Sequence, residues 1–283
     1  MRIVSLLPST TEILFAIGAG DDVVGVTFEC DYPAAARSRT VVSTSAMPEG
    51  LAPAEIDAFV VAAMASGEDL YHLDAGALAG LDADLVVTQD LCAVCAVDVS
   101  VVDDALAHLG CTAEVLTIDP HTLDEVFESI LTLGRATGHA LEAERLVGGQ
   151  RARLDVVRRA RGGARPRVMF LEWTDPPFAP GHWIPEMVEA AGGEPVLATP
   201  GARSRPVTWD AIHAADPDVF VVAPCGFDRD GCRRLADDLV ASGALHAGVP
   251  VLAVDANASW ARPGTRLVDG VEELAALLAP VRS

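Results

Sequence analysis

The stretch MRIVSLLPSTTEILFAIGAGDDVVGVT, residues 1–27, decides the fold because two kinds of apolar pattern alternate within it. Val4–Leu7 is a short and mostly apolar run, which is typical of a buried strand. Ser9–Ile17 has helical spacing and begins with polar residues that favour a helix N-terminus. Val23–Thr27 is again strand-like. A strand, a helix and a second strand in immediate succession predict parallel α/β structure.

The same alternation fills the chain on both sides of one long helical segment. Strand-like runs alternate with helical patterns up to residue 121 and again from residue 163 onward. Residues 122–162 have no strand signal and carry apolar residues at helical spacing. Thr122 and Glu125 match a capping box at the start of this segment. We therefore predict two α/β lobes with parallel sheets, 1–121 and 163–283, joined by a long helix over 122–162.

Composition and charge exclude several classes of partner. The chain has 283 residues, 51% of them apolar, and a net charge of −21. An acidic surface repels nucleic acid phosphates and anionic lipids, so neither is an expected partner. No apolar run is long enough to span a bilayer. The first residues lack the pattern of a secretory signal peptide, which favours a cytoplasmic location; a leader removed from the chain would instead indicate the periplasm.

Ligands of open α/β sheets lie beyond the carboxyl ends of the strands, so the segments after each predicted strand are the candidate site. Three aromatic residues in these segments, Trp173, Phe178 and Trp260, are suited to stacking on a planar ligand. His121 and His182 are candidate axial ligands to iron or cobalt, although a histidine in a surface loop is more often simply solvated.

A C-x-x-C pair, Cys92 and Cys95, follows the predicted strand Leu85–Thr88. Such a pair is half of a zinc site. Cys30, after a neighbouring strand, is positioned to supply a third sulfur, and Cys225 could approach from the other lobe. A redox-active dithiol and simple packing of small thiols stay open as alternatives.

Motifs of the common enzyme classes are missing from the sequence. The sequence has no nucleophile elbow, no phosphate-binding loop and no dinucleotide fingerprint. We therefore expect a binding protein that needs no cofactor. The alternative is a cytoplasmic metal- or thiol-dependent enzyme that uses Cys30, Cys92 and Cys95.

An ordered set of short motifs resembles the helical-backbone substrate-binding proteins, the receptors for vitamin B12, iron siderophores and heme that serve ABC importers. The set covers nearly the whole chain and looks most like the vitamin B12-binding branch. The matching segments are Pro8-Ser9-Thr10-Thr11-Glu12, Val24-Gly25-Val26, Asp31-Tyr32-Pro33, Val42-Ser43-Thr44, Asp84-Leu85-Val86, Pro176-Pro177-Phe178, Ala191-Gly192-Gly193, Asp216-Pro217-Asp218 and Trp260-Ala261-Arg262-Pro263-Gly264.

The resemblance implies two Rossmann-like lobes, a linking helix and a ligand cleft between the lobes. It implies a corrinoid, a heme-like macrocycle or an iron chelate as the ligand, with Arg262 paired to an acidic group on it. An ABC importer is the implied partner if a leader was removed.

Two departures from the family pattern shape the predicted site. Residues Ala52 to Tyr71 form an insertion that the vitamin B12 receptors lack. Glu29, Ser45 and Gln89 stand where those receptors have ring-bearing residues, so we expect a polar, thiol-rich surface on the N-terminal lobe. The predicted ligand contacts are Ser9, Glu29, Cys30, Ser45, Gln89, Asp90, Cys92, Cys95, Trp173, Phe178, Cys225, Trp260 and Arg262, and the predicted metal ligands are Cys30, Cys92 and Cys95.

Overall fold

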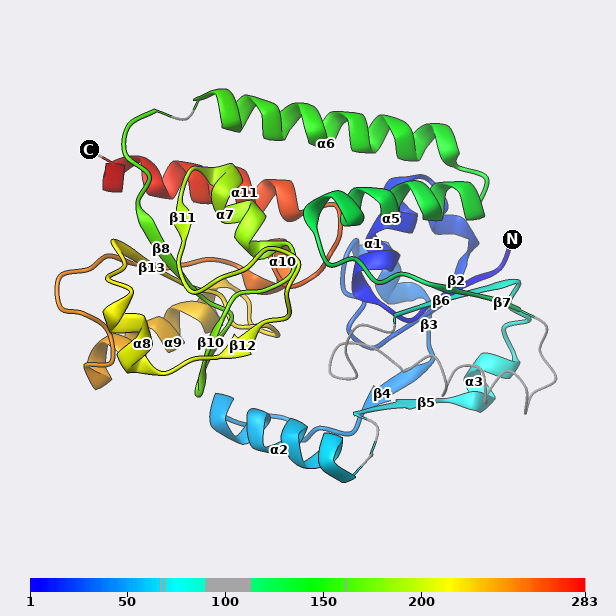
Figure 1. Ribbon diagram of the computed structural model, residues 1–283. Coiled ribbons are helices and arrows are strands. Elements are labelled where there is room, and N and C mark those ends of the chain that lie inside the picture. Colours follow the sequence, from blue (N-terminus) through cyan, green and yellow to red (C-terminus); the bar gives the residue numbers. More distant parts are fainter. Residues whose placement is uncertain (67, 69, 90–112, 161, 283) are drawn as a thin grey trace. The chain divides into compact units, whose positions relative to one another are not determined.

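Two compact α/β units make up the protein in a computed structural model that describes residues 1–66, 68, 70–89, 113–160 and 162–282 (Figure 1). Unit 1 comprises Met1–Pro120 and Phe127–Val147, and unit 2 comprises His121–Val126 and Gly148–Ser283. The predicted α/β architecture with parallel sheets is confirmed. The predicted boundaries at residues 121–122 and 162–163 stay a prediction. The two units share the helical segment, because Phe127–Val147 belongs to unit 1 and the residues on either side of it belong to unit 2.

Unit 1 is built on a five-stranded sheet with the order β3-β2-β1-β6-β7, in which every pair of neighbours is parallel. Alternate side chains point to opposite faces of a strand. Val4 and Val86 pack with Val42 and with Leu78 of α3 on one face. Figure 1 shows α1 and α5 on the opposite face. The strands are β1 (Ile3–Ser5), β2 (Val23–Val26), β3 (Thr40–Val41), β6 (Leu85–Thr88) and β7 (Glu114–Thr117), and the helices are α1 (Pro8–Ala16) and α3 (Ala75–Ala79).

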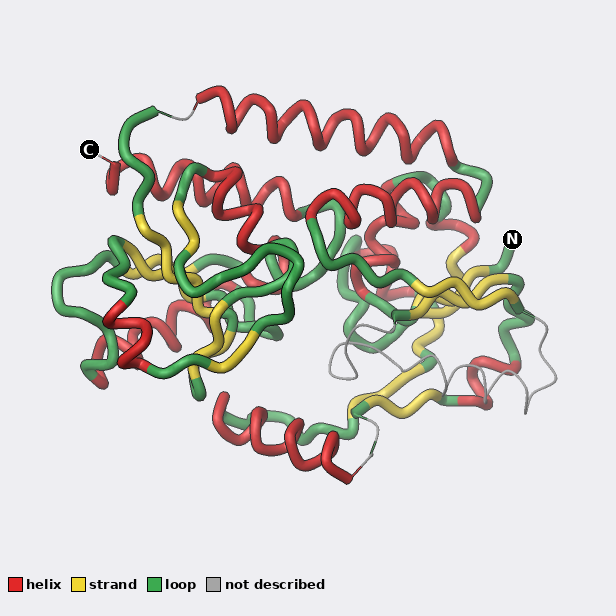
Figure 2. Tube along the Cα trace, viewed as in Figure 1, coloured by secondary structure: helices red, strands yellow, loops and turns green. Residues whose placement is uncertain are grey.

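A two-stranded extension leaves this sheet beside the carboxyl end of β3. The strands β4 (Ser43–Ser45) and β5 (Tyr71–Leu73) pair antiparallel, and α2 (Pro53–Ser66) lies between them in the chain. We call residues 43–73 the arm. It contains the insertion that the sequence indicated at residues 52–71, and Figure 2 shows its two strands and its helix.

Unit 2 is built on a four-stranded parallel sheet with the order β11-β8-β13-β14. Met169 and Phe220 pack with Ile212 of α8 and Ala236 of α9 on one face. On the other face Phe170 lies against Trp260, with ring centroids 4.8 Å apart. The strands are β8 (Arg167–Leu171), β11 (Glu194–Pro195), β13 (Val219–Val222) and β14 (Val251–Ala253), and the helices are α7 (Ile184–Ala191), α8 (Trp209–Ala214), α9 (Arg229–Ser242), α10 (Ala256–Ser259) and α11 (Leu267–Leu278).

The carboxyl end of β8 leads into a small antiparallel sheet with the order β12-β10-β9. Its strands are β9 (Trp173–Thr174), β10 (Pro177–Ala179) and β12 (Arg205–Pro206). This sheet therefore carries residues onto the edge of unit 2 where a ligand of a parallel sheet is expected.

The predicted long helix over 122–162 is present as two helices, α5 (Leu123–Ala136) and α6 (Ala140–Ala160). Gly138 between them has φ +77°, a left-handed conformation that ends a helix and that glycine adopts without steric cost. The predicted capping box at the start of α5 is confirmed. Thr122 N–H donates to Glu125 Oε2 at 3.0 Å, and Glu125 N–H donates to Thr122 Oγ1 at 3.2 Å.

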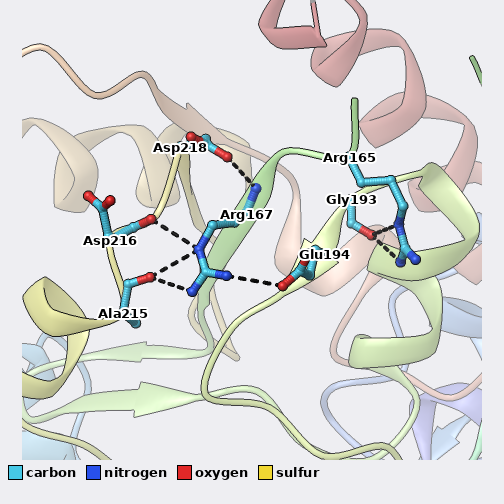
Figure 3. A network of polar contacts seen from close by, with 7 residues as sticks. All are labelled: Arg165, Arg167, Gly193, Glu194, Ala215, Asp216 and Asp218. Atoms are coloured by element: carbon cyan, nitrogen blue, oxygen red, sulfur yellow. Dashed lines mark hydrogen bonds and ion pairs between the residues drawn. The ribbon is translucent and has the colours of Figure 1, made fainter. Parts of the chain in front are cut away.

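The same polar arrangement ties the amino ends of the strands together in both units. In unit 2, Arg167 N–H donates to Asp218 Oδ2 at 2.7 Å, and the Arg167 guanidinium donates to Ala215 O at 2.7 Å (Figure 3). In unit 1, Arg2 N–H donates to Asp84 Oδ2 at 2.7 Å, and Arg2 Nε–H donates to Leu81 O at 2.6 Å.

Asp84 directly precedes β6, and Asp218 directly precedes β13. In each unit the carbonyl that accepts the hydrogen bond from the arginine side chain lies three residues before the aspartate. The residue two before the aspartate has positive φ in both cases, +43° at Asp82 and +47° at Asp216. The two units thus share this arrangement at the amino ends of their strands. These amino ends are engaged in structural contacts, which leaves the carboxyl ends for a ligand.

Candidate functional site

Aromatic side chains gather at the carboxyl edge of unit 2, where the sequence predicted them. Trp173 and Phe178 lie opposite each other on β9 and β10, so their side chains share one face of the small sheet. Trp173 also meets Phe227, with ring centroids 6.0 Å apart. All three rings are partly exposed. They form a surface suited to stacking against a flat ligand.

Phe227 lies in a loop that the sequence reasoning placed at the site, but of that loop only Cys225 was singled out as a ligand contact. The loop follows β13, and its backbone is held from both sides. Cys225 N–H donates to Glu172 O at 3.3 Å, and Asn257 N–H donates to Phe227 O at 3.1 Å. Cys225 itself is an exposed free thiol. The position of Phe227 after a buried strand could have identified it, because ligands of parallel sheets lie beyond the carboxyl ends of the strands.

Trp260 requires a correction, because its side chain is fully buried (0% exposed). Its ring packs on Phe170, and its backbone carbonyl accepts a hydrogen bond from Trp183 Nε1 at 2.8 Å. Trp260 therefore belongs to the core of unit 2 and offers no face for stacking. Arg262, two residues later, is partly exposed.

His182 sits in a tightly fixed loop before α7. Its N–H donates to Ala202 O at 2.6 Å, and its backbone has φ +50°, which strains a residue other than glycine. Its Nε2 atom is buried without a hydrogen-bond partner. Burial, with the nearby charges of His121 and Arg203, lowers the pKa of His182 below its ordinary value. The imidazole is therefore neutral at pH 7.

In unit 1 the start of α1 lies on the predicted edge, but its hydroxyl groups are turned inward. Ser5 Oγ and Thr10 Oγ1 are 2.7 Å apart, and Thr11 Oγ1 donates to Ser5 Oγ at 2.8 Å. Ser9 lies within the first turn of α1 and is 3% exposed. This corrects the prediction that Ser9 faces a ligand directly, because Ser9 is part of a buried first turn.

Cys30 also requires a correction. Its thiol is 3% exposed, and its Sγ lies 3.1 Å from Thr11 Oγ1 and 3.2 Å from Thr27 Oγ1. A buried thiol that contacts two hydroxyl groups is suited to a structural role. Asp90, Cys92 and Cys95 lie outside the described residues. Among the residues that are described, no group of three or more His, Cys, Asp or Glu could hold a metal ion.

The remaining predicted residues of unit 1 divide by exposure. Glu29 and Ser45 are partly exposed, whereas Gln89 is 6% exposed at the end of β6. Besides these polar residues the edge carries two rings, since Phe28 is 43% exposed and its ring lies 6.0 Å from that of Tyr71, centroid to centroid. Sequence reasoning missed this pair because Tyr71 reaches the edge only through the arm.

Comparison with known proteins gives one family over most of the chain. The family model described as "Periplasmic binding protein" matches residues 3–250. The part of the chain that the structure describes contains no helix that is both long and apolar enough to cross a membrane.

Individual relatives match over nearly the whole chain. A cobalamin-binding protein of Halobacterium salinarum is 27% identical over 97% of this chain and 68% of its own. A vitamin B12-binding protein of Yersinia pestis is 24% identical over 99% of this chain and 87% of its own. The apo structure of a periplasmic heme-binding protein of Roseiflexus sp. RS-1 has a TM-score of 0.73 at 21% identity, over 100% of this chain and 99% of its own. That structural likeness shows the fold alone.

Proposed function

Because the chain belongs to the periplasmic binding protein family, we propose that it is a solute-binding protein whose solute is a corrinoid or a heme-like metal macrocycle. The family consists of binding proteins rather than enzymes. Relatives named for cobalamin and vitamin B12 support the ligand class.

The single observation that carries the proposal is the aromatic surface of Trp173, Phe178 and Phe227 at the carboxyl edge of unit 2. A macrocycle has two broad faces, and aromatic rings bury a large area against such a face while losing little conformational freedom. Only 5% of the residues in the chain are aromatic, so three aromatic rings at one edge are a marked local enrichment. Trp173 and Phe178 are fixed on paired strands and Phe227 in a loop held by backbone hydrogen bonds, which prepares the surface before the ligand arrives.

Polar contacts to the periphery of the macrocycle complete the proposal. Arg262 would pair with a carboxylate or phosphate of the ligand, as a guanidinium binds such groups well. Glu29 and Ser45 are exposed enough to contact amide groups. Asp90, Cys92 and Cys95 stay in the proposed set.

An ABC importer is the proposed partner. It would receive the solute from the ligand-bound protein. The name of the family indicates the periplasm. This favours an extracytoplasmic location over the cytoplasmic one that the sequence suggested first. A transport receptor needs no cofactor, and the macrocycle would be its cargo.

The alternative of a thiol-dependent enzyme gains no support from the described cysteines. Cys30 is bonded to two hydroxyl groups in the interior. Burial raises the pKa of the Cys232 thiol to about 11, which keeps it protonated and poorly nucleophilic. Only Cys225 of these three is exposed.

Calorimetric titration of the purified protein with cyanocobalamin and with hemin tests the proposal. We expect at least one of them to bind with a Kd of about 1 μM or tighter, and Trp173→Ala to weaken that binding about tenfold or more. Trp173→Phe is the matched variant, because it keeps a ring at the same place and should retain most of the affinity. Binding weaker than about 100 μM for both compounds would contradict the proposal.

A further inference from the structure

The hairpin that carries Trp173 and Phe178 in unit 2 has few hydrogen bonds of its own. β9 and β10 contribute two residue pairs, Trp173 with Phe178 and Thr174 with Pro177. Pro177 has no N–H group and cannot donate to the ladder, and Pro206 on the neighbouring strand β12 lacks one as well. A hairpin this short is marginally stable at best in water. The positions of its two rings therefore depend on contacts beyond the ladder.

Glu172 lies at the base of this hairpin, directly before β9, and contacts three segments. Its N–H donates to Phe178 O at 3.2 Å, and its carbonyl accepts from Cys225 N–H at 3.3 Å, in the loop that holds Phe227. Its carboxylate Oε2 accepts from Gly181 N–H at 3.1 Å. This last bond joins the residue before the first strand to a residue just after the second, so it closes the base of the hairpin.

Gly181 belongs to a loop whose position is fixed independently of the hairpin. The N–H of the next residue, His182, donates to Ala202 O at 2.6 Å, and the His182 carbonyl accepts from Gly201 N–H at 3.0 Å. Gly181 itself is buried, and it lies so close to the backbone of residues 202–204 that a Cβ atom would not fit. A bond from the hairpin base to Gly181 therefore attaches the hairpin to a rigid part of unit 2.

The rings follow the hairpin when it moves. Trp173 Nε1–H donates to Asp175 O at 3.1 Å within the turn of the same hairpin, which sets the orientation of the indole. The Phe178 side chain shares one face of the small sheet with that of Trp173. A displaced hairpin would shift both rings together, and ordering a mobile surface on binding costs affinity.

We propose that Glu172 is a positioning residue of the solute site in unit 2, which acts through its bond to Gly181 and holds Trp173 and Phe178 ready for stacking. A hydrogen bond from an N–H group to a carboxylate is stronger than one between neutral groups, which suits this role. The inference rests on the proposed function, because it requires a solute that stacks on these rings. It adds a residue that sets affinity without being a surface for the ligand.

Three substitutions of Glu172 separate its bond from its charge. Glu172→Ala removes the acceptor, and Glu172→Asp keeps the charge on a side chain that is one methylene too short to reach Gly181 N–H. Glu172→Gln keeps an acceptor oxygen at the original length. Glu194→Ala is the matched control, because it removes a carboxylate that accepts from Arg167 Nη1 at 3.1 Å at the amino end of β8. Calorimetry measures the Kd for cyanocobalamin and hemin, and circular dichroism with thermal unfolding shows whether each variant is folded.

Glu172→Ala and Glu172→Asp should each raise the Kd of the solute that the wild-type protein binds by about fivefold or more, as expected for one lost hydrogen bond. Glu172→Gln and Glu194→Ala should change it less than about twofold. A double-mutant cycle with Trp173→Ala shows whether Glu172 acts through the ring. Adding Glu172→Ala to Trp173→Ala should weaken binding by less than about twofold further, because the ring that Glu172 positions is already absent.

Several results would overturn the inference and leave the proposed function intact. One is an unchanged Kd in folded Glu172→Ala and Glu172→Asp. Another is a loss in Glu172→Gln equal to that in Glu172→Ala, because the charge rather than the bond would then matter. An equal effect of Glu172→Ala with and without Trp173 would show that Glu172 contacts the solute or acts elsewhere. Failure of both Glu172→Ala and Glu172→Asp to fold would show that the residue is needed for the fold rather than for the site.

A wild-type protein that binds neither cyanocobalamin nor hemin would refute the proposed function and the inference together.

Discussion

Replacing Cys30 tests whether its thiol is a structural anchor or a ligand to a metal. Cys30→Ala removes the hydrogen-bond partner that Thr27 Oγ1 has among the described residues, and Thr27 is 4% exposed. Thr11 is affected less, because its hydroxyl keeps two acceptors within reach, Ser5 Oγ and Leu7 O, and can donate to either. A buried hydroxyl group without a partner costs about 1–3 kcal/mol. The lost packing of the sulfur adds about 1 kcal/mol.

The free energy of unfolding should therefore fall by about 2–4 kcal/mol in Cys30→Ala. Cys30→Ser keeps a group that can bond to both threonines, so its loss should stay below about 1 kcal/mol. Urea denaturation followed by circular dichroism measures both values. An equal loss of unfolding free energy in the two variants would refute the structural role of the Cys30 thiol. So would a metal ion that copurifies with the wild-type protein in a 1:1 ratio and is lost in Cys30→Ser.

Three further predictions concern unit 2. His182 has a folded-state pKa below its ordinary value because of burial and the charges of His121 and Arg203, so the unfolded chain binds the proton more readily. Stability is then complete above about pH 6.5 and falls as the pH drops toward the folded-state pKa. Urea denaturation at pH 7.5 and 5.5 should show that the free energy of unfolding falls less in His182→Asn than in the wild type. An equal fall in both proteins would contradict this prediction. Gly181→Ala should lower stability by about 2 kcal/mol or more, because the new Cβ would meet the backbone of the adjacent loop; a neutral result in thermal unfolding would contradict it. Asp218→Ala should cost about 1 kcal/mol in the same assay without changing ligand affinity, since it removes the bond to the Arg167 N–H at the amino edge; a change in affinity would be unexpected.

The parallel sheets were predictable because each central strand is a short apolar run flanked by helical patterns, as in Val219–Val222. The sequence of Val41–Ser43 alone indicates one very short strand. The structure divides it between β3 and β4, and β4 pairs with β5 about 30 residues later. Local periodicity carries no information about such a distant pairing. The break at Gly138 was recognisable as a possible bend, but the full end of α5 depended on its left-handed backbone.

The candidate site was predicted in location more than in detail. The rule that ligands lie at carboxyl ends of strands identified the loops that hold Trp173, Phe178 and Phe227. The same rule could not distinguish Trp173, which stays partly exposed, from Trp260, which Phe170 buries from the other side. Side-chain burial depends on contacts between distant segments. For that reason the contact between Phe28 and Tyr71 also could not be predicted from the sequence.

Equilibrium dialysis of the wild-type protein against cyanocobalamin and hemin tests the central claim most directly. The account predicts that at least one macrocycle is retained by the protein at saturation with a 1:1 stoichiometry and a Kd of about 1 μM or below. Absence of retention of both macrocycles at concentrations up to about 100 μM would contradict it.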